Sequence, residues 1–188
     1  MKHFAEEKLR AYGDLVRWWA RRVDLVSEKD VARFEERHIR DSLRAAPLVA
    51  SLGPGPAVDV GSGAGLPGIP LSIVDPDRPW TLLEPRSKRA GFLEEVSREL
   101  ELRCDVVVMT AEQAAADRRF AGAHVVATAR ALAAPTRSFD LLAPLVAPGG
   151  VSVVFAGGRA RIPANAELWG PGLPIMRRHD ERGSRRPG

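Results

Sequence analysis

Residues 57–70 contain the residues best suited to bind a ligand through the main chain. An apolar run of four residues precedes Gly61, Gly63 and Gly65, and a helix-like stretch begins at Ile69. A buried strand that runs through glycines into a helix points backbone N–H groups and a helix N-terminus at one place. We therefore predict that an electron-rich ligand lies close to the main chain at this strand end.

The glycine spacing distinguishes two classes of nucleotide ligand. A dinucleotide fingerprint, Gly-x-Gly-x-x-Gly, needs a glycine at position 66, which is Leu66 here. Gly-x-Gly-x-Gly after an acid in the strand fits S-adenosylmethionine (SAM) better. A second apolar run ends in Glu84, about 20 residues further on. In nucleotide-binding folds an acid at this position accepts hydrogen bonds from the two ribose hydroxyls. The predicted SAM site contains Asp59, Gly61, Ser62, Gly63, Gly65, Leu66 and Glu84.

The composition is that of one ordinary globular domain with a small appendage. The chain has 188 residues, of which 45% are hydrophobic and 28% charged, and its net charge of +4 is compatible with nucleic acid without requiring it. No apolar run is long enough to span a membrane, and the acidic start is not a signal peptide. Cys104 is the single cysteine, which argues against disulfides and a cysteine zinc cluster. We expect a cytoplasmic monomer without a metal.

The first part of the chain predicts a helical cap over residues 1–52. Apolar residues in 3–23 fall on one stripe at helical spacing, and we favour a solvated basic face there over a dedicated RNA-binding helix. Ser27 and Asp30 can each cap a second helix that extends from about 31 to 46. The cluster Gly53-Pro54-Gly55-Pro56 ends the cap and is interpreted as a hinge.

From residue 57 the pattern alternates between strands and helices. Strands are expected at 57–60, 80–84, 104–109, 123–128 and 151–155, with helices between them. This order, without hairpin signals, predicts an α/β fold with a doubly wound parallel sheet. Ligands on such sheets lie at the carboxyl ends of the strands. The residues at or just past those ends are Gly61, Glu84, Ala111, Glu112 and Arg130.

The C-terminal part is less regular. Pro148-Gly149-Gly150 predicts a sharp turn, and Leu173 to Met176 predicts one more short strand. The sheet domain is therefore expected to cover residues 57–176. Residues 177–188 form a basic tail with almost no apolar side chain, which we expect to be disordered.

Three motifs together resemble one protein family. They are Arg37-His38-Ile39-Arg40-Asp41-Ser42-Leu43, the segment from Asp59 to Pro70, and Lys88-Arg89 with Phe92-Leu93. From about residue 15 to 157 the chain resembles the 16S ribosomal RNA guanine-N7 methyltransferases, also called glucose-inhibited division protein B. The resemblance implies a class I SAM-dependent methyltransferase with a Rossmann-like fold and a helical N-terminal cap. It also implies S-adenosylhomocysteine as product and 16S rRNA or the small ribosomal subunit as partner.

The resemblance implies roles for individual residues as well. SAM would be contacted at the positions that match Gly61, Leu66, Ala111, Glu112 and Arg130. Arg130 matches the arginine of a Ser-Arg-Ala motif, and it is our predicted catalytic residue because its guanidinium can orient or stack on the acceptor base. Methylation at guanine N7 needs positioning but no general base, since N7 has a lone pair and no proton. We therefore interpret His38 as a structural residue.

The chain departs from the family pattern at three places that usually carry a polar or cationic group. Thr110 stands where the family usually has Arg, Ala156-Gly157 where it has Lys-Gly, and Asp24-Leu25-Val26 where it has Asn-Leu-Thr. Each change removes a group that could contact RNA or guanine. The chain also leaves room for only one of the two last strands that the fold normally carries.

Three functions are therefore open on the sequence. Methylation of guanine N7 in 16S rRNA comes first. A SAM-dependent methyltransferase of a small molecule or free nucleotide comes second, because the missing cations are those that a polyanion would use. A SAM-binding, ribosome-associated protein without catalysis comes third. The sequence does not identify the methylated nucleotide.

Overall fold

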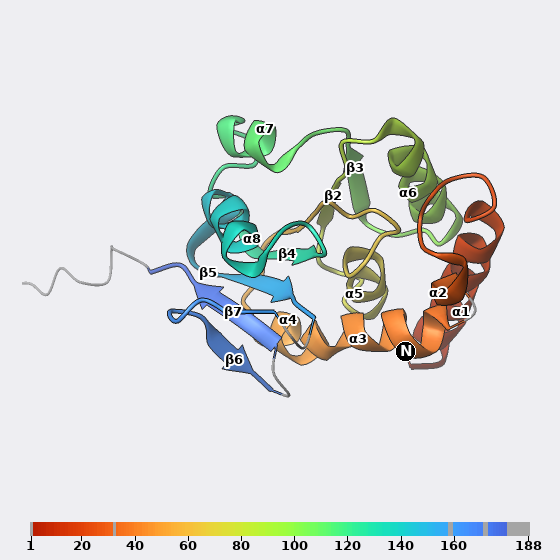
Figure 1. Ribbon diagram of the computed structural model, residues 1–188, viewed down its shortest axis with the longest axis horizontal. Helices are drawn as coiled ribbons and strands as arrows, with labels where there is room; N and C mark the ends of the chain where they lie inside the picture. The colour runs from red at the N-terminus through yellow and green to blue at the C-terminus, as the bar shows by residue number, and fades with distance from the viewer. Residues whose placement is uncertain (1, 32, 158–159, 171–172, 180–188) are drawn as a thin grey trace, which may run out of the picture.

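A mixed sheet of seven strands forms the centre of the computed structural model, which describes residues 2–31, 33–157, 160–170 and 173–179 (Figure 1). The strand order is β3-β2-β1-β4-β5-β7-β6. β1 to β5 are parallel, and β7 pairs antiparallel with both β5 and β6. The strands are β1 (Ala57–Val60), β2 (Trp80–Leu83), β3 (Cys104–Val107), β4 (His124–Arg130), β5 (Val146–Phe155), β6 (Glu167–Trp169) and β7 (Leu173–Arg177).

The doubly wound parallel sheet is confirmed, and two expectations at its C-terminal side are wrong. Room was expected for only one of the two last strands, but both β6 and β7 form. β6 was not predicted because its three residues are too few and too exposed to show an alternation of apolar and polar side chains. The predicted turn at 148–150 lies inside β5. The pairing of β4 with β5 shifts register between His124 and Val126, and proline and glycine are tolerated in a strand at such irregularities.

Helices cover both faces of this sheet. The clusters of buried side chains place α4, α5 and α6 with the N-terminal helices on one face, and α7 and α8 on the other. The bounds are α1 (Lys2–Trp19), α2 (Glu28–Val31), the π-helical turn η1 (Phe34–Ile39), α3 (Arg40–Ser42), the 3-10 turn η2 (Leu43–Ala45), α4 (Ala46–Ser51), α5 (Gly68–Val74), α6 (Ser87–Glu99), α7 (Ala111–Ala116), α8 (Pro135–Leu142) and the 3-10 turn η3 (Ala143–Leu145).

The cap and the sheet share one hydrophobic cluster. Tyr12 and Val16 of α1 belong to the same buried cluster as Ile69 of α5 and Phe92 of α6. Ser27 accepts the N–H of Asp30 at 3.3 Å and so caps α2. The predicted second helix is divided into α2, η1, α3 and η2, so the chain bends as it follows the lower edge of the molecule in Figure 1.

The predicted hinge at 53–56 is fastened by Arg78. This guanidinium is buried and donates to the backbone oxygens of Gly53 at 3.2 Å and Gly55 at 2.8 Å. It also donates to Val49 at 3.1 Å and pairs with Asp75 at 2.7 Å. The junction between cap and sheet is therefore fixed by hydrogen bonds from one buried guanidinium, whose donors need acceptors.

The predicted basic tail begins inside the sheet. β7 ends at Arg177, and the backbone of Arg178 pairs with Gly149 and Gly150 of β5 at 2.9 Å each. Residues 180–188 lie outside the described residues, so the disorder expected for the tail stays a prediction.

Candidate active site

The glycine loop joins β1 to α5. Gly61, Gly63 and Gly65 have φ angles of 68°, 56° and 89°, which favour glycine over every residue with a side chain. A Cβ at Gly61 or Gly65 would lie 2.8 Å from Leu132 or 2.5 Å from Ile69, whereas a Cβ at Gly63 would meet nothing closer than 3.8 Å. A side chain at Gly63 would therefore begin without a steric clash, unlike one at Gly61 or Gly65.

Glu84 lies directly beside this loop at the end of β2. One oxygen of its carboxylate accepts the N–H of Gly63 at 2.9 Å, and the other accepts the N–H of Arg86 at 2.9 Å. Glu84 is 3% exposed. Adjacent parallel strands thus bring together the two features that the sequence assigned to SAM.

Asp59 lies beneath the loop and braces it. Its Oδ2 accepts the N–H of Gly68 at 3.2 Å, and its Oδ1 accepts the hydroxyl of Thr128 at 2.7 Å. Asp59 is fully buried, and this burial raises the pKa of its carboxyl group to about 6. The carboxyl group thus connects β1, α5 and β4 below the ligand-facing surface of the loop.

Asp59→Asn is expected to stabilise the protein in a pH-dependent way. Because the folded-state pKa lies near 6 and the unfolded one near 3.8, the folded protein must ionise a buried acid as the pH rises through that interval. The variant should therefore unfold with a free energy higher than wild type by about 1–3 kcal/mol near pH 7.5. Urea denaturation at several pH values measures this difference, which should shrink towards pH 4. A difference that is the same at all pH values would contradict this account.

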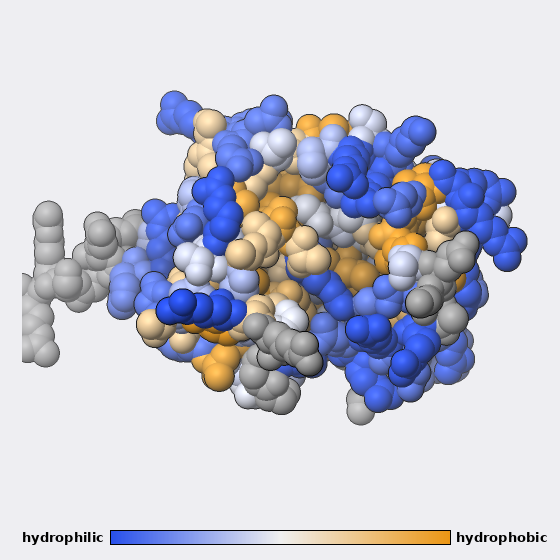
Figure 2. Space-filling view, in the orientation of Figure 1, coloured by the Kyte–Doolittle hydropathy of each residue, from blue (hydrophilic) through white to orange (hydrophobic). Residues whose placement is uncertain are grey.

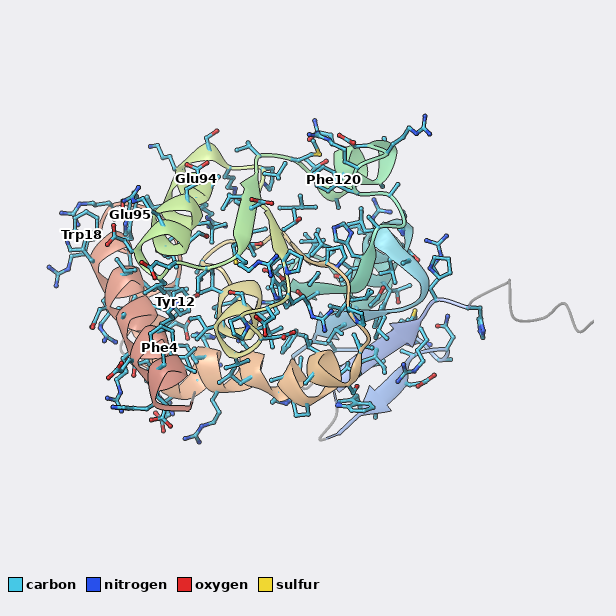
Figure 3. The ribbon with its side chains drawn as sticks, turned by 180° about the vertical axis from the view of Figure 1, so that it is seen from behind. Phe4, Tyr12, Trp18, Glu94, Glu95 and Phe120 are labelled. Carbon is cyan, nitrogen blue, oxygen red and sulfur yellow. The ribbon has the colours of Figure 1, made fainter. Side chains whose placement is uncertain are left out.

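Tyr12 connects the cap to the glycine loop. Its hydroxyl donates to the backbone oxygen of Ala64 at 2.6 Å, and the ring is fully buried. Figure 3 shows the side chain pointing from α1 into the molecule. Burial raises the pKa of Tyr12 well above its usual value, so the hydroxyl stays a donor. This contact is not predicted by the sequence pattern. Its one signal is that the chain's single tyrosine lies on the apolar stripe of α1.

Arg130 ends β4, and the cap holds its guanidinium. One nitrogen lies 2.8 Å from Nδ1 of His38, and another lies 3.3 Å from both the backbone oxygen of His38 and the carboxylate of Asp41. Burial and the charge of Arg130 lower the pKa of His38, so Nδ1 is free to accept this bond at neutral pH. The Arg-His-x-x-Asp-Ser-Leu motif, on η1 and α3, therefore positions Arg130, and His38 does more than stabilise a helix.

A cavity of about 500 Å³ opens beside Arg130, between the cap and the carboxyl ends of β4 and β5. This volume is in the range of small-molecule sites. Three arginines line it, and Asp41 is the one carboxylate among its described lining residues. The lining residues are Arg37, Asp41, Arg44, Arg130, Ala131, Ala133, Pro135, Val154, Phe155, Ala156, Gly157 and Ala160.

The N-terminus of α7 is capped by two residues of the same segment, Thr110 and Gln113. Thr110, which stands in place of a family arginine, accepts the N–H of Gln113 at 3.2 Å while the Gln113 side chain accepts the N–H of Thr110 at 2.8 Å. Glu112 is exposed and pairs with Arg137 of α8 at 3.1 Å. Ala111 is buried against the face that α7 and α8 cover. The structure thus places Glu112 against α8, without a contact to the glycine loop.

Comparison with known proteins identifies the family. Residues 5–167 match the family model described as rRNA small subunit methyltransferase G. The chain belongs to this family. It is 43% identical over 165 residues to Ribosomal RNA small subunit methyltransferase G of Acidiphilium cryptum, covering 86% of this chain and 73% of the relative. It is 40% identical over 154 residues to the protein of that name from Granulibacter bethesdensis, covering 82% and 69%.

Solved structures agree on the fold. A SAM-dependent O-methyltransferase of Thermotoga maritima has a TM-score of 0.51 at 18% identity, over 64% of this chain and 44% of that one. Together with the sheet order, membership in the methyltransferase G family confirms the predicted family, the class I methyltransferase fold and the enzyme class. The chain is a SAM-dependent methyltransferase.

The residues of the glycine loop fit SAM. A Cβ at Gly63 would meet no protein atom closer than 3.8 Å, and the neighbouring carboxylate of Glu84 is of the type that accepts a ribose hydroxyl pair. SAM bound there would supply a methyl group on a positively charged sulfur. Ser62 and Leu66 are buried, and Ser62 donates to the backbone oxygen of Asp59 at 3.0 Å, so both shape the loop from beneath. The individual SAM contacts stay predictions.

No group of three or more His, Cys, Asp or Glu side chains among the described residues is arranged to hold a metal ion. Within the same residues, no helix combines the length and apolar character needed to cross a membrane.

Proposed function

We propose that this enzyme methylates N7 of a guanine in 16S rRNA with SAM as the methyl donor. The observation that carries the proposal is the arginine-lined cavity at Arg130, which opens at the same edge of the sheet as the glycine loop. Membership in the rRNA small subunit methyltransferase G family supports it. A cytoplasmic location is part of the same proposal, because ribosomal subunits are found there.

The cavity offers donors and positive charge in place of a general base. A guanidinium can donate to O6 of guanine or stack on the ring, and either contact leaves the N7 lone pair available. Asp41, the carboxylate at the cavity, is already paired with Arg130 at 3.3 Å and Arg44 at 2.8 Å. Such a site suits an acceptor atom that loses no proton on methylation, so positioning carries the catalysis.

A free guanine nucleotide is the second candidate substrate. Ala156 and Gly157 line the cavity where the family usually has Lys-Gly, which lowers the charge available to a polyanion. Arg37 and Arg44 of the cap nevertheless line the same cavity. We favour RNA because these side chains keep the cavity cationic after the loss at Ala156.

The test is a substrate competition. Purified enzyme with radiolabelled SAM is offered unmodified 16S rRNA, small ribosomal subunits or free guanosine triphosphate, and the nucleosides are identified by mass spectrometry. We expect N7-methylguanosine in the rRNA or the subunit. Label in the free nucleotide alone would replace this proposal with the second candidate.

A further inference from the structure

A row of four arginines follows the exposed side of the cap. Arg33, Arg37, Arg40 and Arg44 are spaced by four, three and four residues along η1, α3 and η2. Helical spacing of this kind places side chains along one face. The row is roughly 16 Å long at the usual rise of about 1.5 Å per residue. Figure 2 shows hydrophilic residues over this part of the cap.

The first three arginines of the row are available to a ligand. The side chains of Arg33 and Arg37 are 64% and 65% exposed, and their partners Glu36 and Asp30 are 3.5 and 3.3 Å away. Exposed pairs of this kind contribute about 0–1 kcal/mol, so a phosphate can displace them. Arg40 is exposed and has no ion pair with another described residue. The guanidinium donors of Arg33, Arg37 and Arg40 are thus largely solvated.

The row leads into the cavity beside Arg130. A shallow depression of about 450 Å³ is lined by the four arginines together with Glu36 and Asp41. It shares Arg37, Asp41 and Arg44 with that cavity. A strand that lies along the depression therefore reaches the cavity without leaving the cationic surface.

The basic face of α1 is a weaker candidate for the same role. Arg17 is held by Asp14 at 2.6 Å and Glu35 at 2.9 Å. Arg22 lies 3.7 Å from the centre of the Trp18 ring and donates to the Trp18 backbone oxygen. Figure 3 shows Trp18 at the outer edge of the molecule. These side chains are therefore already engaged by other residues of the cap.

We propose that Arg33, Arg37 and Arg40 bind backbone phosphates of the single-stranded RNA that delivers the acceptor base to the Arg130 cavity. The inference rests on the proposed function, because it assumes an RNA substrate. Arginine suits this role, since its planar fork donates two hydrogen bonds to one phosphate. Phosphates recur regularly along a strand, which matches a regularly spaced row of cations better than the irregular charges of a folded protein partner.

The test compares two double variants that each remove two charges. Arg33→Gln/Arg40→Gln alters the row outside the cavity. Arg10→Gln/Arg21→Gln is the matched control, with Arg10 on α1 and Arg21 in the turn that follows it. Binding to unmodified 16S rRNA is measured at several salt concentrations, and SAM affinity by calorimetry. The row variant should bind roughly 10-fold more weakly near 0.15 M salt, and its salt slope should fall by about 1.4, for two lost contacts to a single strand. The control variant should keep the wild-type slope, and both should keep the wild-type SAM affinity.

The outcomes separate the two proposals. If wild type methylates 16S rRNA but the row variant keeps its salt slope, or the control loses as much as the row variant, the phosphate row is refuted and the proposed function stands. If wild type neither binds nor methylates 16S rRNA, both are refuted.

Discussion

Gly63→Val is expected to weaken SAM binding by roughly 100-fold or more, about 2.7 kcal/mol, while the protein stays folded. The reason is local: a Cβ at this position lies beside the carboxylate of Glu84 and meets no protein atom closer than 3.8 Å, so the added side chain occupies the predicted ligand site without a clash at Cβ. The valine side chain therefore competes with the ligand and does not disturb the packing of the hydrophobic core. Isothermal calorimetry with SAM measures the effect, and thermal unfolding reports the state of the fold.

Gly170→Val is the matched control for this prediction. Gly170 has a φ of 51°, close to the 56° of Gly63, and a Cβ there meets nothing within 4 Å, so neither position gives a steric clash. A side chain at a positive φ costs on the order of 1–2 kcal/mol, so the backbone strain is similar in the two variants. Gly170 lies between β6 and β7, away from the glycine loop, so its variant should bind SAM like wild type. A folded Gly63→Val protein with wild-type SAM affinity would contradict the assignment of the loop.

Arg130→Ala is expected to lower the turnover of 16S rRNA methylation by 10-fold or more, about 1.4 kcal/mol. Arg130→Lys should recover little of this loss, because an ammonium group cannot contact both His38 and Asp41 while presenting a planar face to a base. Single-turnover kinetics with saturating SAM measures the rate of the chemical step.

Two further variants distinguish positioning from stability. Asp41→Asn keeps the shape of the side chain but removes the charge that pairs with Arg130, so it should lower turnover less than Arg130→Ala does. Arg103→Ala is the control. Arg103 is exposed, directly precedes β3 and donates to the backbone oxygen of Asp77. It therefore lies at the amino ends of the strands, whereas Arg130 lies at a carboxyl end. Wild-type turnover in Arg130→Ala would show that this arginine only attaches the cap to the sheet.

The part of the site that lies on consecutive elements could be predicted from the sequence. Short apolar runs and glycines report the local backbone, so β1, the glycine loop and β2 were found at nearly their observed bounds. The contact between Gly63 and Glu84 then follows from the pairing of adjacent parallel strands.

The contacts that cross between the cap and the sheet could not be predicted. The bond from Tyr12 to Ala64 joins residues 52 positions apart, and the bond from Arg130 to His38 joins residues 92 positions apart. Both depend on how α1 and η1 pack on the sheet, which periodicity does not determine. The role of Thr110 was also not predicted. Thr110 was considered only as the loss of a family arginine, whereas in the structure its side chain caps α7.

The most direct test of the central claim is nucleoside mass spectrometry of 16S rRNA from a strain that lacks this gene. We expect the N7-methylguanosine content of the 16S rRNA to fall, to return with the wild-type gene, and to stay low with the gene for Arg130→Ala. An unchanged N7-methylguanosine content in the deletion strain would contradict the claim that this enzyme methylates guanine in 16S rRNA.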